Sequence, residues 1–277
     1  MSTDLPMPSA ARPAPAGHDC GSCVAHPGAA VSRLGPAPDG CDAVVALAGN
    51  PNTGKSTVFN ALTGMRQHVG NWPGTTVARA EGACAVHGRT YRVVDLPGCY
   101  SLLSASRDED VARDALLFGD PDVVVVVVDA TRLERNLNLV LQVLQVTGRV
   151  VVALNLMDEA RRHGLEIDVR HLTRELGVPV VPMAARRGEG VAELLEEVAA
   201  LASGIRRVRR PRLSASLPAG TARAVQELAA LLTREYPGLV NAPWVALRLL
   251  EGDRGTEAAL SDGSLAELAR SRAARSA

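Results

Sequence analysis

The sequence has few aromatic residues, no excess charge and no long apolar run, and each absence excludes a class of protein. Aromatic residues make up 3% of its 277 residues, which argues against a stacking platform for single-stranded nucleic acid. The 30 Lys and Arg side chains balance 30 Asp and Glu, so no overall field attracts nucleic acid or anionic lipid. The longest apolar run, residues 123–128, is too short to cross a bilayer and is typical of a buried strand.

Cysteine is also scarce, and its placement does not indicate a secreted disulfide framework. No basic segment followed by an apolar stretch marks a secretory signal, so we expect a cytoplasmic chain without a transmembrane segment. Cys20 and Cys23 lie between His18 and His26, a group able to bind Zn²⁺ or Fe²⁺ or to act as a redox pair. Their spacing differs from that of structural zinc sites, and we favour a flexible tail.

The chain divides into a tail, an α/β domain, a linker and a helical part. Residues 1–41 are rich in Ala, Pro and Gly and are expected to be disordered. Residues 42–202 alternate short aliphatic segments with amphipathic ones, which predicts a mostly parallel sheet with helices on both faces. Residues 203–218 form a linker whose basic run, 206–212, we interpret as solvated. Residues 219–277 are helical only and form a partial helical domain.

The expected strands and helices follow from this alternation. Strands are predicted at residues 43–48, 77–86, 90–95, 123–129, 149–155 and 179–182. Helices are predicted at residues 55–62, 108–117, 133–147, 168–176, 191–201, 221–236, 243–251 and 264–275. A hairpin turn at His87-Gly88 predicts one antiparallel edge strand.

Residues 49–56 read Gly-Asn-Pro-Asn-Thr-Gly-Lys-Ser, between an expected strand and an expected helix. This is the context that the phosphate-loop motif G-x-x-x-x-G-K-S requires. The glycines let successive N–H groups point at phosphate oxygens, and the helix start adds its positive end. Lys55 is expected to reach the β- and γ-phosphates and Ser56 to ligate Mg²⁺. The motif predicts nucleotide binding but not the base.

Asn155-Leu-Met-Asp158 follows an expected strand and predicts the base. A carboxylate at Asp158 can accept hydrogen bonds from guanine N1–H and the exocyclic amino group, a donor pair that adenine lacks. The loop after the next strand, with Ala184 and Ala185, offers a backbone N–H to guanine O6. We therefore predict a Ras-like P-loop GTPase domain that binds GTP or GDP.

Two further segments are typical of GTPase switches. In Asp95-Leu-Pro-Gly98, Asp95 is expected to hold Mg²⁺ through water, and the Gly98 N–H to sense the γ-phosphate. In the loop of residues 70–76, a threonine can close over Mg²⁺ and the γ-phosphate and release after hydrolysis. Thr76 is our choice for that threonine, with Thr75 as the competitor.

Cys99 follows Gly98, where Ras-like enzymes carry a glutamine that orients the attacking water. A thiol with a pKa of about 8.5 is a poor substitute for that glutamine, so the catalytic charge must come from another group. Asn52, with the backbone carbonyls of Gly70 and Trp72, can ligate a monovalent cation where an arginine finger places its charge. Alternatively, Trp72 simply anchors its loop.

The expected site residues form three sets. The catalytic residues are Lys55, Asn52, Thr76 and Gly98. The cation ligands are Ser56, Thr76 and Asp95 for Mg²⁺, and Asn52, Gly70 and Trp72 for the monovalent cation. The nucleotide contacts are Gly49, Asn50, Pro51, Asn52, Thr53, Gly54, Lys55, Ser56, Thr57, Gly74, Thr75, Thr76, Asp95, Leu96, Pro97, Gly98, Asn155, Met157, Asp158, Ala184 and Ala185.

Several longer stretches resemble the ferrous-iron transport protein B (FeoB) family, specifically its cytosolic N-terminal G domain. The segments G-N-W-P-G at residues 70–74 and L-E-R-N-L at 133–137 are far more specific than general G-domain motifs. Residues 249–253, L-L-E-G-D, resemble the helical switch domain of the same family. The other matching stretches are residues 47–64, 66–77, 94–102, 128–137 and 153–158.

The resemblance implies a GTPase that is stimulated by potassium and coupled to ferrous-iron uptake, with GTP or GDP, Mg²⁺ and K⁺ as cofactors. It implies a location at the inner face of the cell membrane and switch loops that signal to a membrane permease part, covalent or separate. Small cytosolic accessory proteins and a homo-oligomer are further expected partners; nucleic acid is not. Family members continue into a polytopic membrane domain, whereas this sequence ends at Ala277, within the helical domain.

Two other interpretations stay open at this point. One is a soluble GTPase of the Era or TrmE type that acts on RNA or ribosomes, which requires an RNA-binding appendage that the sequence does not indicate. The other is a nucleotide-binding remnant without hydrolysis.

Overall fold

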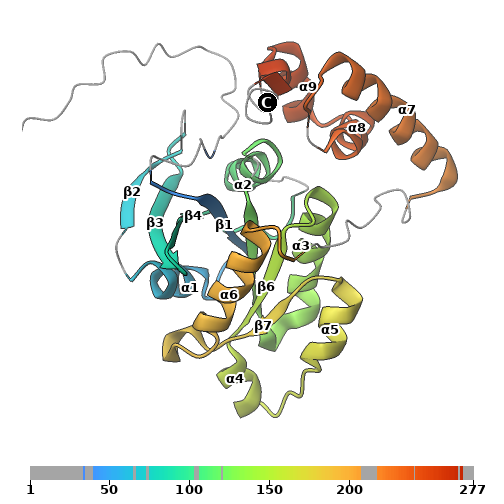
Figure 1. Ribbon diagram of the computed structural model, residues 1–277. Coiled ribbons are helices and arrows are strands. Elements are labelled where there is room, and N and C mark those ends of the chain that lie inside the picture. Colours follow the sequence, from blue (N-terminus) through green and yellow to red (C-terminus); the bar gives the residue numbers. More distant parts are fainter. Residues whose placement is uncertain are drawn as a thin grey trace, which may run out of the picture.

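The chain folds into a seven-stranded sheet with helices on both faces, followed by a smaller helical unit (Figure 1). The computed structural model describes residues 34, 40–64, 67–72, 75–102, 106–119, 121–206, 217–239, 241–267 and 269–270. The spatial order of the strands is β2-β3-β4-β1-β5-β6-β7. The strands are β1 (Ala43–Gly49), β2 (Gln67–Asn71), β3 (Ala78–Val86), β4 (Arg89–Asp95), β5 (Val123–Asp129), β6 (Val150–Asn155) and β7 (Val180–Pro182).

Strand β5 explains the class of the fold. Its sequence is Val-Val-Val-Val-Val-Val-Asp, and every residue in it is buried. β-branched side chains favour an extended backbone, and a strand that is apolar on both faces needs a cover on both. Its neighbours β1 and β6 pair with it in parallel. The predicted α/β class, with a mostly parallel sheet, is confirmed.

The antiparallel part of the sheet differs from the prediction. The β3–β4 hairpin turns at His87 and Gly88, both with positive φ, as expected. However, β3 is not an edge strand, because β2 pairs with its other side. The sequence of β2, Gln-His-Val-Gly-Asn, lacks apolar alternation, and its Val69 is 70% exposed. The strand therefore depends on backbone pairing rather than on burial, which is why periodicity did not reveal it.

The helices lie in a layer on each face of the sheet. Helices α1 (Lys55–Thr63) and α6 (Val191–Ala202) bury apolar side chains against one face. Helices α2 (Arg107–Phe118), α3 (Leu133–Val146) and α5 (Val169–Leu176) cover the other. The strands and these helices together position the loops at the carboxyl edge of the sheet.

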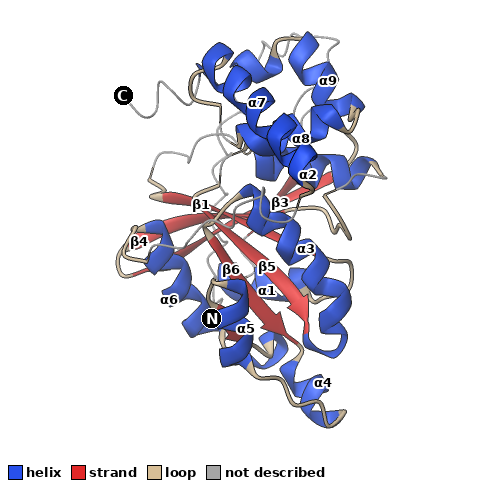
Figure 2. Ribbon diagram, turned by 90° about the vertical axis from the view of Figure 1, so that its right-hand side faces the viewer, coloured by secondary structure: helices blue, strands red, loops and turns tan. Residues whose placement is uncertain are grey.

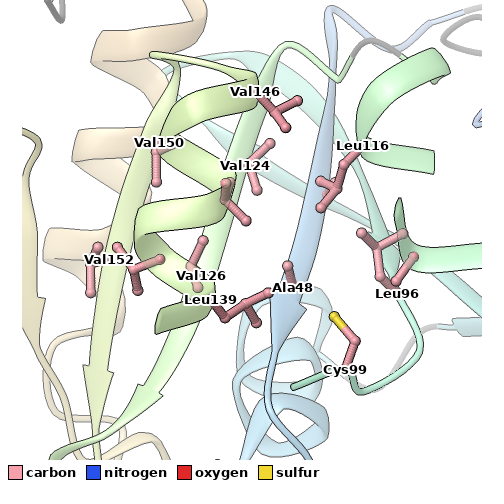
Figure 3. Packing of buried hydrophobic residues seen from close by; sticks show 14 of the residues in the cluster. Ala48, Leu96, Cys99, Leu116, Val124, Val126, Leu139, Val146, Val150 and Val152 are labelled. Carbon is pink, nitrogen blue, oxygen red and sulfur yellow. The ribbon is translucent and has the colours of Figure 1, made fainter. Parts of the chain in front are cut away.

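Leu139 of α3 illustrates the packing of the second layer. Figure 3 shows its side chain lying over Ala48 of β1 and Val126 of β5. All three side chains are fully buried. The recurrence of apolar residues along α3 at helical spacing places this contact at the centre of the sheet.

The helical unit packs against helix α2 and has a core of its own (Figure 2). It contains α7 (Ala219–Glu235), α8 (Ala242–Leu250) and α9 (Arg254–Ser261). Trp244 of α8 joins the core of the sheet, and Phe118 of α2 packs on the core of the helical unit.

Two helices were not predicted. Helix α4 (Met157–Arg162) starts inside the N-x-x-D motif, after Leu156 with a φ of 63°. Helix α9 begins at the cap residue Asp253, whose side chain accepts a hydrogen bond from the Thr256 N–H. Glycine and acidic residues obscured its apolar period. Of the helix expected at 264–275, residues 264–267 and 269–270 are helical and the rest lie outside the described residues.

Leu34 departs from the expectation of a disordered tail. Its side chain is fully buried in the core that α2 and α3 share with the sheet. Cys20 and Cys23 lie outside the described residues. Within the described ranges, no helix is long and apolar enough to cross a membrane.

Replacing Leu139 tests the packing under α3. Because Leu139 is fully buried, Leu139→Ala should lower the free energy of unfolding by about 2–5 kcal/mol in urea titrations followed by circular dichroism. Leu141 lies on the same helix and is 53% exposed, so Leu141→Ala should cost less than about 0.5 kcal/mol. Equal losses in the two variants would contradict this account of the core.

Candidate nucleotide site

The phosphate-loop motif connects β1 to α1, and the backbone geometry requires both of its glycines. Gly54, the cap of α1, has a φ of 80°, a conformation that costs other residues energy. A Cβ at Gly54 would lie 2.5 Å from Asn155 Nδ2. A Cβ at Gly49 would lie 2.7 Å from the Val127 carbonyl oxygen of β5. The backbone therefore passes close to two neighbouring strands, which leaves no room for a side chain.

The side chains of this loop differ in exposure. Asn50 and Thr53 are buried, and the Thr53 hydroxyl donates to the Asn50 carbonyl at 3.0 Å. The Asn50 carboxamide is buried and has no hydrogen-bond partner in the part of the chain that the structure describes. The exposed side chains, which face solvent at the start of α1, are Pro51, Asn52, Ser56 and Thr57.

Asn155 ties the phosphate loop to the end of β7. Its Nδ2 donates to the Thr53 carbonyl at 3.0 Å, and its Oδ1 accepts from the Ala185 N–H at 3.1 Å. The side chain is 1% exposed, so these bonds are shielded from water. The structure thus brings the predicted residues Asn155, Ala184 and Ala185 together with the phosphate loop. The Ala185 N–H, expected to meet guanine O6, is already engaged here.

Asp158, the predicted base-selecting residue, lies in the first turn of α4 next to buried Met157. Its carboxylate is 18% exposed and lies 3.7 Å from Nε of Arg187. Arg187 is 62% exposed and comes from the loop that contains Ala185. The sequence prediction did not include Arg187, because only the fold brings it opposite Asp158.

Lys55 and Asp95 form an ion pair at the bottom of the site. Both side chains are mostly buried, and Asp95 lies beside Leu47 because β4 and β1 pair in parallel. Burial raises the pKa of Asp95 above its usual value, and the ammonium group of Lys55 opposes that rise. The Asp95 carboxylate and the Ser56 hydroxyl are oxygen ligands of the kind Mg²⁺ prefers. They fit the expected Mg²⁺ site, which in such proteins is completed by phosphates and water.

The segment after Asp95 packs directly on the phosphate loop. The Cys99 N–H donates to the Gly49 carbonyl at 3.2 Å, and Gly98 contacts Pro51 so closely that a Cβ would lie 3.3 Å away. Leu96 is buried and Pro97 is half-buried. Burial first, and the nearby Glu109 second, raise the pKa of Cys99 to about 12. The thiol therefore stays protonated at neutral pH and cannot serve as a general base.

Trp72, Thr75 and Val77 are joined by hydrogen bonds around the Trp72 carbonyl. This oxygen accepts from the Thr75 N–H at 3.0 Å and from the Thr75 hydroxyl at 3.1 Å. The Thr75 hydroxyl in turn accepts from the Val77 N–H at 3.2 Å. Thr76 is exposed, and Gly74 lies outside the described residues.

The expected ligands of the monovalent cation are exposed or already engaged in this structure. Asn52 and Gly70 are exposed, and no hydrogen bond of the described residues joins Asn52 to Gly70 or Trp72. The Trp72 carbonyl is engaged by Thr75, while its ring is 1% exposed and packs in the core. Burial of its ring makes Trp72 an anchor of its loop, and its role as a cation ligand stays a prediction.

The site region also contacts the helical unit through α2. Arg113 is 3% exposed and lies within 3.0 Å of Asp110 and Asp114 and 3.5 Å from Asp253, the cap of α9. Asp253 also accepts from Arg248 at 2.8 Å. Burial raises the pKa of Asp114 to about 6. The sequence did not indicate this cluster, because Arg248 and Asp253 are far from Asp110, Arg113 and Asp114 in the chain.

The comparisons with known proteins agree on one family. A family model described as ferrous iron transport protein B matches residues 43–198. The Fe(2+) transporter FeoB of Salmonella typhimurium is 42% identical over 234 residues, which are 81% of this chain and 30% of the relative. The Escherichia coli K12 transporter is 38% identical over 217 residues, 76% of this chain and 27% of the relative. The chain thus spans about 30% of the length of the Salmonella relative.

Solved structures extend the likeness to both parts of the chain. The cytosolic domain of the T. maritima FeoB iron transporter in a GDP form is 37% identical with a TM-score of 0.70. The match covers 82% of this chain and 85% of that one. The cytosolic domain of L. pneumophila FeoB is 35% identical, with a TM-score of 0.71 and coverage of 81% and 88%.

Gly54 provides a test of the loop geometry. Gly54→Ala combines an unfavourable φ with a clash against Asn155, and should lower the free energy of unfolding by about 2–4 kcal/mol. Gly64, the cap at the other end of α1, also has a positive φ, but a Cβ there would meet no described atom within 4 Å. Gly64→Ala should therefore cost only about 1 kcal/mol. Urea unfolding of the ligand-free protein measures both, and equal costs would refute the clash.

Proposed function

The chain belongs to the ferrous iron transport protein B family, and we propose that its sheet domain binds GTP with Mg²⁺ and hydrolyses it for ferrous-iron uptake. The family's G domain is a P-loop GTPase domain. Hydrolysis by this chain, its coupling to iron and its location at the inner face of the cell membrane are parts of the proposal. Family membership favours this interpretation over an Era- or TrmE-type GTPase.

The hydrogen bonds of Asn155 are the observation that carries the proposal. They fix the loops of Thr53 and Ala185 relative to Asn155, which stands three residues before Asp158 at the carboxyl edge of the sheet. A guanine held by Asp158 then places its phosphates over the loop that ends in Lys55 and Ser56. The T. maritima relative has been solved in a GDP form and in a GMPPNP form.

In this scheme, nucleotide binding replaces an ion pair that already exists; it does not supply partners to unpaired charges. Lys55 leaves Asp95 for the β- and γ-phosphates, and Asp95 becomes available to the Mg²⁺ shell. Mg²⁺, when bound, neutralises charge on the phosphate oxygens. Thr76 is our choice for the threonine that closes over the site, with Thr75 as the competitor; the Thr75 hydroxyl becomes available only when it releases the Trp72 carbonyl.

Catalytic charge is proposed to come from K⁺, because the buried Cys99 thiol cannot supply it. Asn52 offers a side-chain oxygen in the phosphate loop, and Gly70 and Trp72 offer backbone carbonyls. The Trp72 carbonyl becomes a ligand only after Thr75 releases it. The cation site and the switch threonine are therefore expected to form together.

The route from the switch to a membrane partner is proposed to run through Arg113. Helix α2 follows the Asp95–Gly98 segment, and its buried Arg113 contacts Asp253 of the helical unit. A shift of α2 changes this contact directly, since a buried charge tolerates little loss of its partners. The partner that would receive the signal is the membrane permease part of the transporter, with small cytosolic accessory proteins and a homo-oligomer as further candidates.

Steady-state hydrolysis tests the enzyme and its cation together. At equal ionic strength with Mg²⁺, phosphate release from GTP should be roughly tenfold or more faster in KCl than in NaCl. Asn52→Ala should reduce the rate in KCl to the rate in NaCl while GTP affinity changes little. Equal rates in both salts would refute cation activation, and no hydrolysis in either would leave a nucleotide-binding remnant.

The Arg113–Asp253 contact is tested by Asp253→Asn. Asparagine keeps the cap of α9 but removes the charge that faces Arg113 and Arg248. In the unmodified protein, a non-hydrolysable GTP analogue should change hydrogen exchange in α8 and α9 relative to GDP. That nucleotide-dependent difference should disappear in Asp253→Asn.

Glu251→Gln is the matched control, since Glu251 pairs with Arg248 at 2.7 Å and is 45% exposed. It should keep the nucleotide-dependent difference in exchange. If Asp253→Asn also keeps it, the signal does not pass through this ion pair.

A further inference from the structure

We propose that Arg79 is a positioning residue for the loop that carries the switch threonines. Leu34, which precedes the G-domain sequence, supplies a further contact that holds Arg79 in place. The inference rests on the proposed GTPase function, which gives the loop its role. Together Arg79 and Leu34 form a latch that holds Trp72 inward and keeps Thr75 bonded to the Trp72 carbonyl.

Arg79 is placed on Trp72 by the pairing of β2 with β3. Arg79 lies opposite Gly70 in the register of these strands, and its guanidinium carbon is 4.6 Å from the centroid of the Trp72 ring. Arg79 also forms an ion pair with Glu81 on the same strand, which orients the guanidinium plane. A guanidinium over an indole face, shielded from water, is a favourable cation–π contact.

Leu34 reaches the same guanidinium from the other side. Its carbonyl accepts a hydrogen bond from Arg79 Nη2 at 2.9 Å, and its side chain is 0% exposed. The side chain fills the space at the end of α2, where a Cβ on Gly119 would lie 2.7 Å from Leu34 Cγ. Leu34, which precedes the first strand, therefore contacts both Arg79, which holds the Trp72 ring, and the end of α2, the helix that carries Arg113.

The position of Trp72 decides whether Thr75 is available. Its carbonyl holds the Thr75 N–H and hydroxyl, and its backbone N–H donates to the Val77 carbonyl at 2.9 Å. While the ring is anchored, these bonds keep Thr75 engaged. On the proposed function, closure of Thr75 over a triphosphate breaks these bonds, so a tighter latch lowers affinity for GTP relative to GDP. Loss of a shielded cation–π contact should change that ratio by roughly threefold to thirtyfold.

The first measurement needs no nucleotide. In a Trp244→Phe background Trp72 is the remaining tryptophan, because the sequence contains two. Arg79→Gln should shift Trp72 emission to longer wavelength and increase its quenching by acrylamide, whereas Arg79→Lys should restore part of the shielding. Arg92→Gln is the matched control. Arg92 lies on β4 and pairs with the same Glu81 at 2.7 Å, and its replacement should leave Trp72 shielded. Equal quenching in Arg79→Gln and Arg92→Gln would overturn the latch.

The second measurement compares affinities for GMPPNP and GDP with Mg²⁺. Arg79→Gln should raise the affinity for GMPPNP relative to GDP by roughly threefold to thirtyfold. Leu34→Ala should act in the same direction, and Leu34→Met, which conserves volume, should resemble the unmodified protein. If Leu34→Ala lowers thermal stability but leaves both Trp72 quenching and the ratio unchanged, Leu34 is only a packing residue and the proposal fails. If the unmodified protein binds neither nucleotide, the proposed function fails, and Trp72 quenching still decides the latch.

Discussion

The buried carboxamide of Asn155 holds together the loops on which the nucleotide site depends. Parallel strands bring their carboxyl ends to one edge of the sheet, but they do not fix how the loops beyond that edge lie. Asn155 does so by donating to the Thr53 carbonyl and accepting from the Ala185 N–H, both away from water. Gly54 is required for the same reason, since any side chain there would occupy the space of the carboxamide. One side chain therefore links the loop proposed to hold the base to the loop proposed to hold the phosphates.

The parts of the fold that could be predicted from the sequence are those with a strong local pattern. The valine run of β5 and the glycines and lysine of the phosphate loop are confined to single segments, so periodicity and spacing suffice to find them. Strand β2 has no apolar alternation; the strand forms because its backbone pairs with β3. Helix α9 depends on the cap that Asp253 provides. Leu34 is buried only because α2 and Arg79 offer it a place, which a low-complexity segment does not reveal.

The same division holds within the candidate site. Motif spacing named Lys55, Asp95, Asn155 and Asp158, because each stands at a fixed place after a strand. It did not reveal that Lys55 pairs with Asp95, that Arg187 faces Asp158, or that the Trp72 carbonyl is engaged. Those pairings depend on which loops the fold brings together. They matter because they describe the state that a nucleotide has to displace.

In the proposed cycle this internal pairing makes binding selective. A ligand that carries phosphates but no guanine can draw Lys55 from Asp95, yet leaves Asp158 with Arg187 and the Ala185 N–H with Asn155. A guanine nucleotide without a γ-phosphate offers Thr75 no new partner, so Thr75 stays bound to Trp72. Only a ligand with both a guanine and a γ-phosphate replaces every partner that it displaces. A buried polar group that loses its partner without a replacement costs desolvation free energy. Release of the γ-phosphate then removes the last of those replacements, and Thr75 bonds to the Trp72 carbonyl again, with Arg79 and Leu34 holding the Trp72 ring. The difference between the two nucleotide states is therefore concentrated at the Trp72 anchor and at α2, the two elements that the latch of Arg79 and Leu34 connects.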